Sequence, residues 1–418
     1  MRKYISILLL IISTNIAAQK LSLQTCIDSA VVNYPLSKQA EIYQQIMQSD
    51  LQKIQNSNLP QVDLNGKATY QSEAISLPIH LPGLLVPEIN KDQYKVQLEI
   101  NQAIYKGGLT KAQKELSKSN NAISNTQIDI QLGEVKRSLI ATYYQILLNK
   151  DLINISTTFQ KTLEVKQQEM QAQIDAGVLL KSAADLIKVE QLTIEQKILE
   201  LEINQKTLAS QLQKITGINI STETQFEIPK YELNNDGAQQ RPEYKLLILS
   251  QQKIDVLKSF STAQSMPKAF AFTTLGYGRP GFNYLSNEFA PYALVGVGFS
   301  WTLWNWGNFK EEKKLLDFNK NVIETQKENF LLNLSMNLLQ LHGEIETQEM
   351  LLKQAEEIVK LRKNIAETTD NLMKNGVVNA SQYIDDLQKF EKSKLDAQVY
   401  KIKLSIAQTN YLWTLGKL

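Results

Sequence analysis

Apolar residues recur at heptad spacing along much of this chain, which predicts long helices that pack as coiled coils. After Ser182, apolar residues fall seven positions apart, with Ile198 and Leu212 between them. They are Ile187, Ile194, Leu201, Leu208 and Ile215. The preceding stretch, from about 109 to 175, begins with the same spacing and contains one Gly and no Pro. At about 1.5 Å per residue it would form a helix of about 100 Å.

Four shorter segments alternate apolar and polar residues, which predicts β-strands with one apolar face. They are residues 62–71, 94–105, 268–278 and 292–304. The sheet of a soluble protein can alternate in the same way. Segment lengths of about ten residues, with aromatic residues at the strand ends, favour strands that cross a membrane. The expected aromatic belt consists of Tyr105, Trp301, Trp304 and Trp306.

The second half of the chain repeats the plan of the first half. Pro60 recurs as Pro267, an offset of 207 residues, and Gly177 recurs as Gly376, an offset of 199 residues. Each half contains a short helix, two strands, a very long helix, a Gly turn and a medium helix. The two shorter helices would stack end to end against the long one in an antiparallel coiled-coil strip. We predict a first repeat at 19–217, an irregular linker at 218–240 and a second repeat at 241–418, with its long helix at about 308–375.

Residues 1–18 have the features of a secretory signal, because Arg2 and Lys3 precede an apolar run and Ala17 and Ala18 offer a cleavage site. The apolar run is shorter than the roughly eighteen residues that a membrane helix needs. Loss of this segment would change 45 basic and 43 acidic residues to 43 of each. A chain without net charge gives no electrostatic reason to expect nucleic acid as a partner.

The chain offers few side chains for catalysis or metal binding. One cysteine, Cys26, and two histidines, His80 and His342, are too few for a disulfide within the chain or for a zinc or haem site. The run from Gly276 to Gly281 matches a dinucleotide-binding motif by its letters, but Pro280 stands where the helix of that motif would begin. We therefore expect no enzyme activity, no cofactor and no resident metal.

The four strands of one chain cannot close a barrel in a membrane. Open sheet edges are not tolerated in lipid, and at least eight strands are needed. Two copies of the chain would give eight strands and a lumen filled by side chains, whereas three copies would give twelve strands and room for a pore. We therefore expect the chain to form an oligomer.

Several short motifs occur in the same order in both halves. The halves begin with Asn33-Tyr34-Pro35 and Arg241-Pro242-Glu243-Tyr244, and their first strands follow Leu59-Pro60-Gln61 and Met266-Pro267-Lys268. A Gly precedes each long helix, and a Gly-Val turn follows it, with Ser five residues after that second Gly. By this order and duplication, nearly the whole chain after residue 18 resembles the TolC-type outer membrane efflux proteins.

The resemblance implies a mainly α protein with membrane β-strands. Three chains would form a twelve-stranded β-barrel in the outer membrane of a Gram-negative bacterium and a long antiparallel coiled-coil tunnel in the periplasm, with the linker at 218–240 around the tunnel's middle. The function would be a passive export duct of a tripartite efflux or type I secretion system. Its partners would be a periplasmic adaptor (membrane fusion) protein, an inner-membrane transporter of the RND, ABC or MFS type, and outer membrane lipid. The alternative is a periplasmic coiled-coil scaffold or adaptor without a barrel, which leaves the amphipathic strands without a purpose.

The resemblance also assigns roles to residues near the two Gly turns. The helix tips that dock the adaptor would contain Gly177, Val178, Ser182, Gly376, Val377 and Ser381. At the positions of two acidic gate residues of the best-known member, this chain has Gln382 and Asp385, so cation binding there should be weaker. Asp386 and Asp185 are the next gate candidates. Turn geometry alone can also explain both glycines, and we expect Ser182 to cap its helix with Asp185 three residues later.

Overall fold

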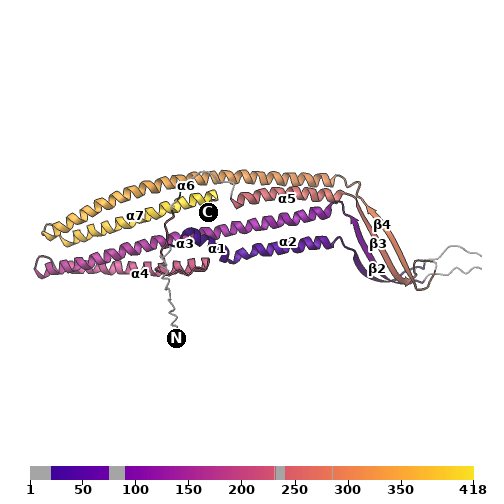
Figure 1. The fold of residues 1–418 in the computed structure, drawn as a ribbon, viewed down its shortest axis with the longest axis horizontal. Helices are drawn as coiled ribbons and strands as arrows, with labels where there is room; N and C mark the ends of the chain where they lie inside the picture. The colour runs from indigo at the N-terminus through magenta and orange to yellow at the C-terminus, as the bar shows by residue number, and fades with distance from the viewer. Residues whose placement is uncertain (1–19, 75–89, 230, 232–240, 285) are drawn as a thin grey trace, which may run out of the picture. The chain divides into compact units, whose positions relative to one another are not determined.

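The computed structural model describes residues 20–74, 90–229, 231, 241–284 and 286–418 (Figure 1). The predicted signal at 1–18 and His80 lie outside these residues, as does most of the predicted linker after residue 229. The elements of the first half are α1 (Leu23–Asn33), a 3-10 turn (Pro35–Ser37), α2 (Lys38–Asn56), β1 (Gln61–Tyr70), β2 (Asp92–Tyr105), α3 (Leu109–Asp175) and α4 (Ser182–Thr216). Those of the second half are α5 (Pro242–Ser265), β3 (Lys268–Arg279), β4 (Ala290–Ser300), α6 (Asn308–Lys374) and α7 (Ala380–Leu415).

The prediction of a mainly helical chain with four strands is confirmed. Helices α3 and α6 have 67 residues each, and they run without a break because neither contains a proline and their apolar residues keep helical spacing. α3 has the predicted bounds, and α6 ends one residue earlier than predicted. Within the described ranges, no helix is both long enough and apolar enough to cross a membrane.

The chain forms two compact units, and each draws on both halves of the sequence. The sheet unit contains residues 39–127 and 242–329. The tip unit contains the residues up to 38, together with 128–241 and 330–418.

The sheet unit holds one antiparallel sheet with the strand order β1-β2-β3-β4. Its registers gather apolar residues on one face, since Leu98 lies opposite both Leu64 and Leu275, and Leu275 lies opposite Ala293. This is the face that the alternation of the sequence predicted. Among the described residues, β1 and β4 each pair with a strand on one side only.

The last strand is shorter than predicted. β4 ends at Ser300, whereas the sequence pattern continues to residue 304. β2 reaches Tyr105 because Tyr105 pairs with Ala269 of β3, beyond Asn101, which lies opposite the first residue of β1. Residues 301–304 have no such neighbour among the described strands, so their alternating pattern is not enough to form a ladder.

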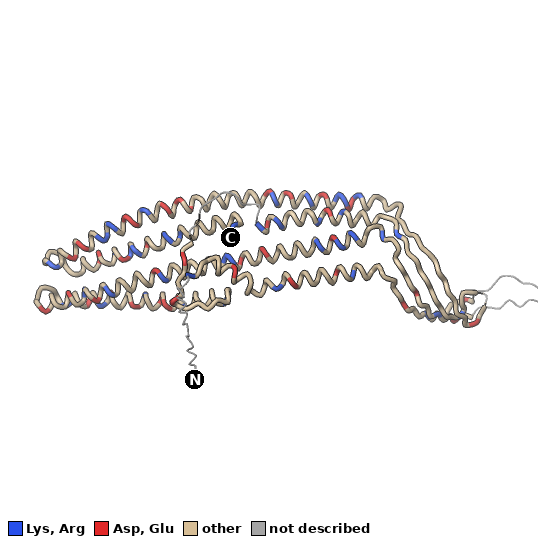
Figure 2. The backbone as a smooth tube through the Cα atoms, viewed as in Figure 1, with Lys and Arg blue, Asp and Glu red and all other residues tan. Residues whose placement is uncertain are grey.

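Ion pairs and hydrogen bonds fasten α5 to the start of α6 in the sheet unit. Lys320 donates to Asp255 at 2.8 Å, Gln251 donates to Glu324 at 2.6 Å, and Lys258 pairs with Asp317. Figure 2 shows basic and acidic residues interleaved along the helices, without a long run of one sign. Other charged residues pair locally on an exposed helix face, as in Lys314 with Glu311.

In the tip unit, α4 runs back along α3 and α7 runs back along α6 (Figure 1). The larger buried cluster packs α1 against α3 and α4, and includes Cys26, Ile27, Leu139, Tyr143 and Leu212. The Tyr143 hydroxyl lies 2.7 Å from the carbonyl oxygens of Leu21 and Glu227. Tyr143 thus ties the segment at 218–229 and the start of the chain's described part to the middle of α3.

Candidate docking tips, gate and aromatic belt

Both helix tips use the same glycine turn. Gly177 and Gly376 have φ angles of 76° and 72°, which are left-handed. In the first tip the Gly177 N–H donates to the Ile174 carbonyl at 3.0 Å, and the Val178 N–H donates to the Gln173 carbonyl at 2.8 Å. The second tip makes the same two backbone hydrogen bonds at the corresponding residues of the second half. These are Schellman motifs, which satisfy the last carbonyls of a helix and favour glycine for its left-handed conformation.

The tips leave room around their glycines. A Cβ added to Gly177 or Gly376 would meet no heavy atom within 4 Å in the described part of the chain. The following residues, Val178 and Val377, are 57% and 67% exposed. The glycines are therefore needed for their backbone angle rather than for close packing, and apolar side chains face solvent beside them.

The prediction that Ser182 caps its helix is wrong. Lys181 is the N-cap of α4, it already has helical backbone angles (φ −56°, ψ −30°), and it makes no side-chain cap hydrogen bond. Ser182 is the first residue of the helix, which leaves its side chain no capping position. In the second tip, Asn379 has extended angles, and its side chain accepts from the Gln382 N–H at 2.9 Å. Ser381 lies inside α7.

An ion cluster joins α3 and α6 just before the tips. Lys166 donates to Asp370 at 2.9 Å and to Glu169 at 2.8 Å, and Lys374 lies 2.9 Å from Asp370. Burial raises the pKa of Asp370, but hydrogen bonds from Lys374 and Lys166 outweigh it and hold that pKa below its ordinary value. Burial lowers the pKa of Lys166, while its bonds to Glu169 and Asp370 raise it more, so the ammonium stays charged. Sequence reasoning missed this cluster because its members are up to 208 residues apart, from Lys166 to Lys374.

A shared apolar cluster lies beside these ions and holds the two tips together. It draws residues from α3, α4, α6 and α7, among them Leu163, Met170, Ile187, Met373 and Tyr383. The Lys166 ammonium lies 5.7 Å from the centre of the Tyr383 ring. The helices that end at the two Gly turns, α3 and α6, therefore share one apolar core in this part of the tip unit.

The four gate candidates lie in different surroundings. Gln382 and Asp385 are exposed on α7, and Asp385 forms an ion pair with Lys389 one turn further along. Asp386 faces α6 and accepts from the Thr369 hydroxyl at 2.9 Å. Asp185 is exposed on α4. A gate made by several chains stays a prediction, and Asp385 is the exposed carboxylate on α7 that such a gate could use.

The predicted belt residues are all exposed in the sheet unit. Trp304 and Trp306 are 74% and 86% exposed, and their ring centres lie 6.0 Å apart at an angle of 77°. The Trp301 indole N–H donates to the Ser265 carbonyl at 3.1 Å. Trp301 and Tyr105 are about half exposed. The aromatic residues thus gather where the strands end and the long helices begin, while their contact with lipid stays a prediction.

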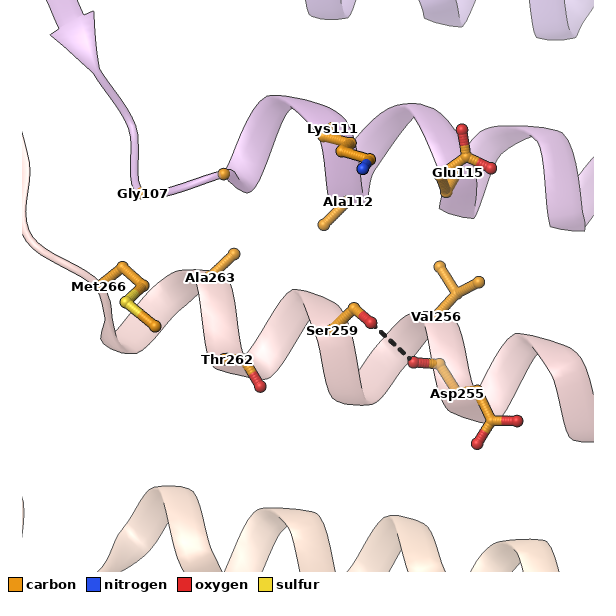
Figure 3. A pocket seen from close by; sticks show the side chains of 11 residues that line it. Gly107, Lys111, Ala112, Glu115, Asp255, Val256, Ser259, Thr262, Ala263 and Met266 are labelled. Carbon is orange, nitrogen blue, oxygen red and sulfur yellow. Dashed lines mark hydrogen bonds between the residues drawn. The ribbon is translucent and has the colours of Figure 1, made fainter.

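A groove of about 440 Å³ lies between α5 and the first turns of α3 (Figure 3). Ala112, Val256 and Ala263 contribute apolar walls, and the Ser259 hydroxyl donates to the Asp255 carbonyl of its own helix. At its end, a Cβ on Gly107 would lie 2.6 Å from the Met266 Cβ and 2.9 Å from the Ala263 carbonyl oxygen. The groove therefore marks a close helix contact. Among the described residues, no group of three His, Cys, Asp or Glu side chains could hold a metal ion.

Comparison with solved structures identifies the fold. The CmeC outer membrane channel of Campylobacter jejuni matches with a TM-score of 0.67 and 15% identity over 94% of this chain and 85% of that one. The outer membrane protein VceC of Vibrio cholerae matches with a TM-score of 0.66 and 12% identity over 94% and 96% of the two chains. The MtrE outer membrane channel of Neisseria gonorrhoeae, in its open state, matches with a TM-score of 0.68 and 13% identity over 94% and 88%. No family model and no curated protein matches the sequence.

The chain therefore has the fold of outer membrane channels, as its resemblance to TolC-type proteins predicted. At these identities the likeness is one of fold. The matches cover nearly all of this chain, including both halves of the repeat.

Proposed function

We propose that this protein is the outer membrane duct of a tripartite efflux or type I secretion system. The observation that carries the proposal is the combination of an amphipathic four-stranded sheet with two 67-residue helices in a fold shared with outer membrane channels. Such a duct performs no chemistry, and the transporter in the inner membrane supplies the energy. A coiled-coil scaffold would be released in aqueous buffer, whereas a barrel needs detergent.

The proposed duct is a homotrimer. Large apolar side chains stay exposed on one face of the strands, among them Val295 at 75% and Val297 at 80%. Apolar side chains of this size on a sheet face fit contact with lipid. Helix α6 also exposes a series of apolar residues, which fits packing against another chain. That series includes Leu332, Met336, Leu339, Met350, Ile358, Leu361 and Ile365.

The proposed partners are a periplasmic adaptor protein at the tips and an RND, ABC or MFS transporter in the inner membrane. The tips fit an adaptor site because each presents an exposed valine beside a turn that is free of steric contact on its outer side. The aromatic residues Trp301, Trp304 and Trp306, with Tyr105, would lie at the membrane surface. The strands would then lie in the outer membrane of a Gram-negative bacterium, with the helices in the periplasm.

Replacing Gly376 by leucine tests the docking role. The substitution places a non-Gly residue in the left-handed region, which costs about 1 to 2 kcal/mol, and its side chain would project into open space. We expect normal amounts of trimer in the outer membrane but loss of export, measured as survival of cells on a toxic pump substrate.

Gly376→Ala is the matched control, because it carries the same backbone strain without the bulk. It should support export nearly as well as the native chain. Loss of trimer and export together in Gly376→Leu would contradict docking at this turn and would direct the search to neighbouring residues such as Lys181 and Lys374. Gly177→Leu tests the first tip in the same way.

Asp385→Ala tests the gate. Three Asp385 carboxylates around one pore would attract multivalent cations, although each has Lys389 beside it. We expect block of single-channel current by multivalent cations to weaken several-fold in planar bilayers. Asp386→Ala is the comparison, since Asp386 is engaged by Thr369 within the chain. Unchanged block in Asp385→Ala, with weaker block in Asp386→Ala or Asp185→Ala, would move the gate to those residues.

A further inference from the structure

We propose that a hollow at the start of α3 binds an anionic phospholipid from the leaflet of the outer membrane that faces the periplasm. Lysines at the start of α3 would hold the phosphate, and the end of β2 would contact the glycerol and the first part of the acyl chains. The inference rests on the proposed duct, because only a barrel in that membrane places this hollow beside lipid. It goes beyond the duct by naming a lipid class and the residues that select it.

The hollow has a volume of about 460 Å³ and lies between the end of β2, the residues after α2 and the first turns of α3. Its strand side is apolar, since it includes Ile104, which is 62% exposed, and Tyr105, which is 53% exposed. Its helix side is basic. Four lysines line it, which we call the junction lysines: Lys106, Lys111, Lys114 and Lys118. An apolar side next to a basic side matches the acyl chains and the phosphate of an anionic lipid.

Two of the junction lysines are available to an anion from outside the chain. Lys118 forms an ion pair with Glu115 at 3.0 Å. Lys111 and Lys114 form no ion pair with any residue that the structure describes. Spacings of three and four residues place Lys111, Lys114 and Lys118 on the same side of α3, where like charges destabilise a helix. An anion bound between them would remove this repulsion.

The second half of the chain shows that the fold does not require this excess of positive charge. Residues 106–118 contain four lysines and one glutamate, a net charge of +3. Their counterparts at an offset of 199, residues 305–317, contain three lysines and three acidic residues, a net charge of zero. There Glu312 accepts from a serine hydroxyl of α5 at 2.7 Å, and Asp317 pairs with a lysine of α5. Both halves nevertheless form a helix of 67 residues, so the charge excess of the first half is free to serve a ligand.

The junction lysines lie at the level where a membrane barrel would meet lipid headgroups. Tyr105, the last residue of β2, belongs to the proposed aromatic belt. Lys111 and Lys114 lie about 3 and 8 Å along α3 from its first residue, at about 1.5 Å per residue. The headgroup region on each side of a bilayer is about 5 to 8 Å thick, and lysine side chains extend along apolar surface to reach polar groups. Both ammonium groups would therefore reach a lipid phosphate.

A lipid fits this hollow better than a soluble anion does. A free phosphate would use the lysines and leave Ile104 and Tyr105 exposed to water, whereas a lipid would cover the apolar side as well. The hollow is also continuous with the apolar face of the sheet, because it includes the end of β2. Earlier residues of that strand, Val96 and Leu98, lie on the apolar face opposite Tyr277 and Leu275. The occupant to which we commit is therefore a phospholipid.

Lipid retention by the purified trimer tests the site. The trimer is mixed in non-ionic detergent with phosphatidylglycerol or with phosphatidylcholine of the same acyl chains, passed through a size-exclusion column, and analysed for bound lipid by mass spectrometry. We expect the native trimer to retain phosphatidylglycerol in preference. A lysine beside an anionic headgroup strengthens binding about fivefold, so Lys111→Gln with Lys114→Gln should reduce the preference by about tenfold or more. Raising the ionic strength from about 0.1 M to about 1 M should also reduce it, through screening.

The matched control is Lys310→Gln with Lys313→Gln, at the corresponding positions of α6. Lys310 is exposed and Lys313 is half-buried, as Lys111 and Lys114 are. The control therefore removes the same charge from the same kind of position without changing the hollow, and the preference for phosphatidylglycerol should persist. Lys111→Arg with Lys114→Arg keeps the positive charge and should preserve the preference as well.

Three results with a native chain that still migrates as a trimer would overturn the lipid site and leave the proposed duct intact. They are equal retention of the two lipids, equal loss of preference in both pairs of glutamine variants, and displacement of phosphatidylglycerol by an equal concentration of inorganic phosphate. If the Lys111 and Lys114 glutamine pair forms no trimer, the salt series on the native protein decides, and a preference that salt does not reduce would overturn the site. A native chain that is monomeric in detergent would overturn the duct itself.

Discussion

Gly107→Ala is expected to deplete folded trimer strongly, whereas Gly108→Ala should have a small effect. Both glycines have positive φ angles, of 66° and 86°, so both substitutions carry strain of about 1 to 2 kcal/mol. Only at Gly107 would the new Cβ meet the Met266 Cβ at 2.6 Å and the Ala263 carbonyl oxygen at 2.9 Å. Crowding of this kind adds about 1 to 3 kcal/mol, and the backbone oxygen cannot turn away as a flexible side chain could.

The comparison of the two variants isolates the close contact in Figure 3 from backbone strain. The measurement is the amount of heat-modifiable trimer in the outer membrane and its unfolding temperature in detergent. Each chain of a trimer would carry the cost, so the difference should be large. Equal losses in both variants would show that strain alone decides the outcome and that α5 can move away from the start of α3.

Leu98→Arg is the second change with a large expected effect. Leu98 lies in the middle of the apolar face, opposite both Leu64 and Leu275. An arginine on the lipid face of a barrel costs about 2 to 4 kcal/mol near the middle of the bilayer. Because three chains would carry the substitution, we expect little trimer in the outer membrane, measured on a native gel of detergent extracts.

Gln97→Arg is its control. Gln97 is the neighbouring residue, lies opposite Asn65 and Gly276, and points to the other face of the sheet. An arginine there should face the water-filled lumen and reduce the amount of trimer much less. Equal loss for Leu98→Arg and Gln97→Arg would contradict the assignment of the apolar face to lipid.

The helices and most of the strands follow from local sequence. The bounds of α3 could be predicted because a heptad pattern continues without proline between a glycine before the helix and a glycine after it. Both the heptad pattern and the glycine turns are signals that depend only on residues near one another in the sequence. The end of β4 could not be predicted, because a strand needs a neighbour and the neighbour of residues 301–304 is missing from the described chain. Alternation of apolar and polar residues predicts which face of a sheet each side chain would occupy. It does not predict whether a neighbouring strand is present to pair with.

The details at the tips depended on contacts that the sequence does not place together. The pattern from Ser182 to Asp185 suggested a helix cap. In the structure, Lys181 already has helical backbone angles, so the helix starts before Ser182 can cap it. The signal for the cap at Asn379 was present, since an Asn precedes Gln382 by three residues. The Lys166 and Asp370 pair carried no such signal, because it forms only when α3 and α6 lie side by side.

The free edges of β1 and β4 have a consequence for the chain before it assembles. An unpaired strand edge offers its N–H and C=O groups to any passing strand, and exposed Val295 and Val297 lie on β4, one of the two edge strands. A newly made chain is therefore prone to aggregation until other copies reach it. We expect slow expression to give a higher yield of native trimer than rapid expression, with the excess of the rapidly made protein recovered as insoluble material.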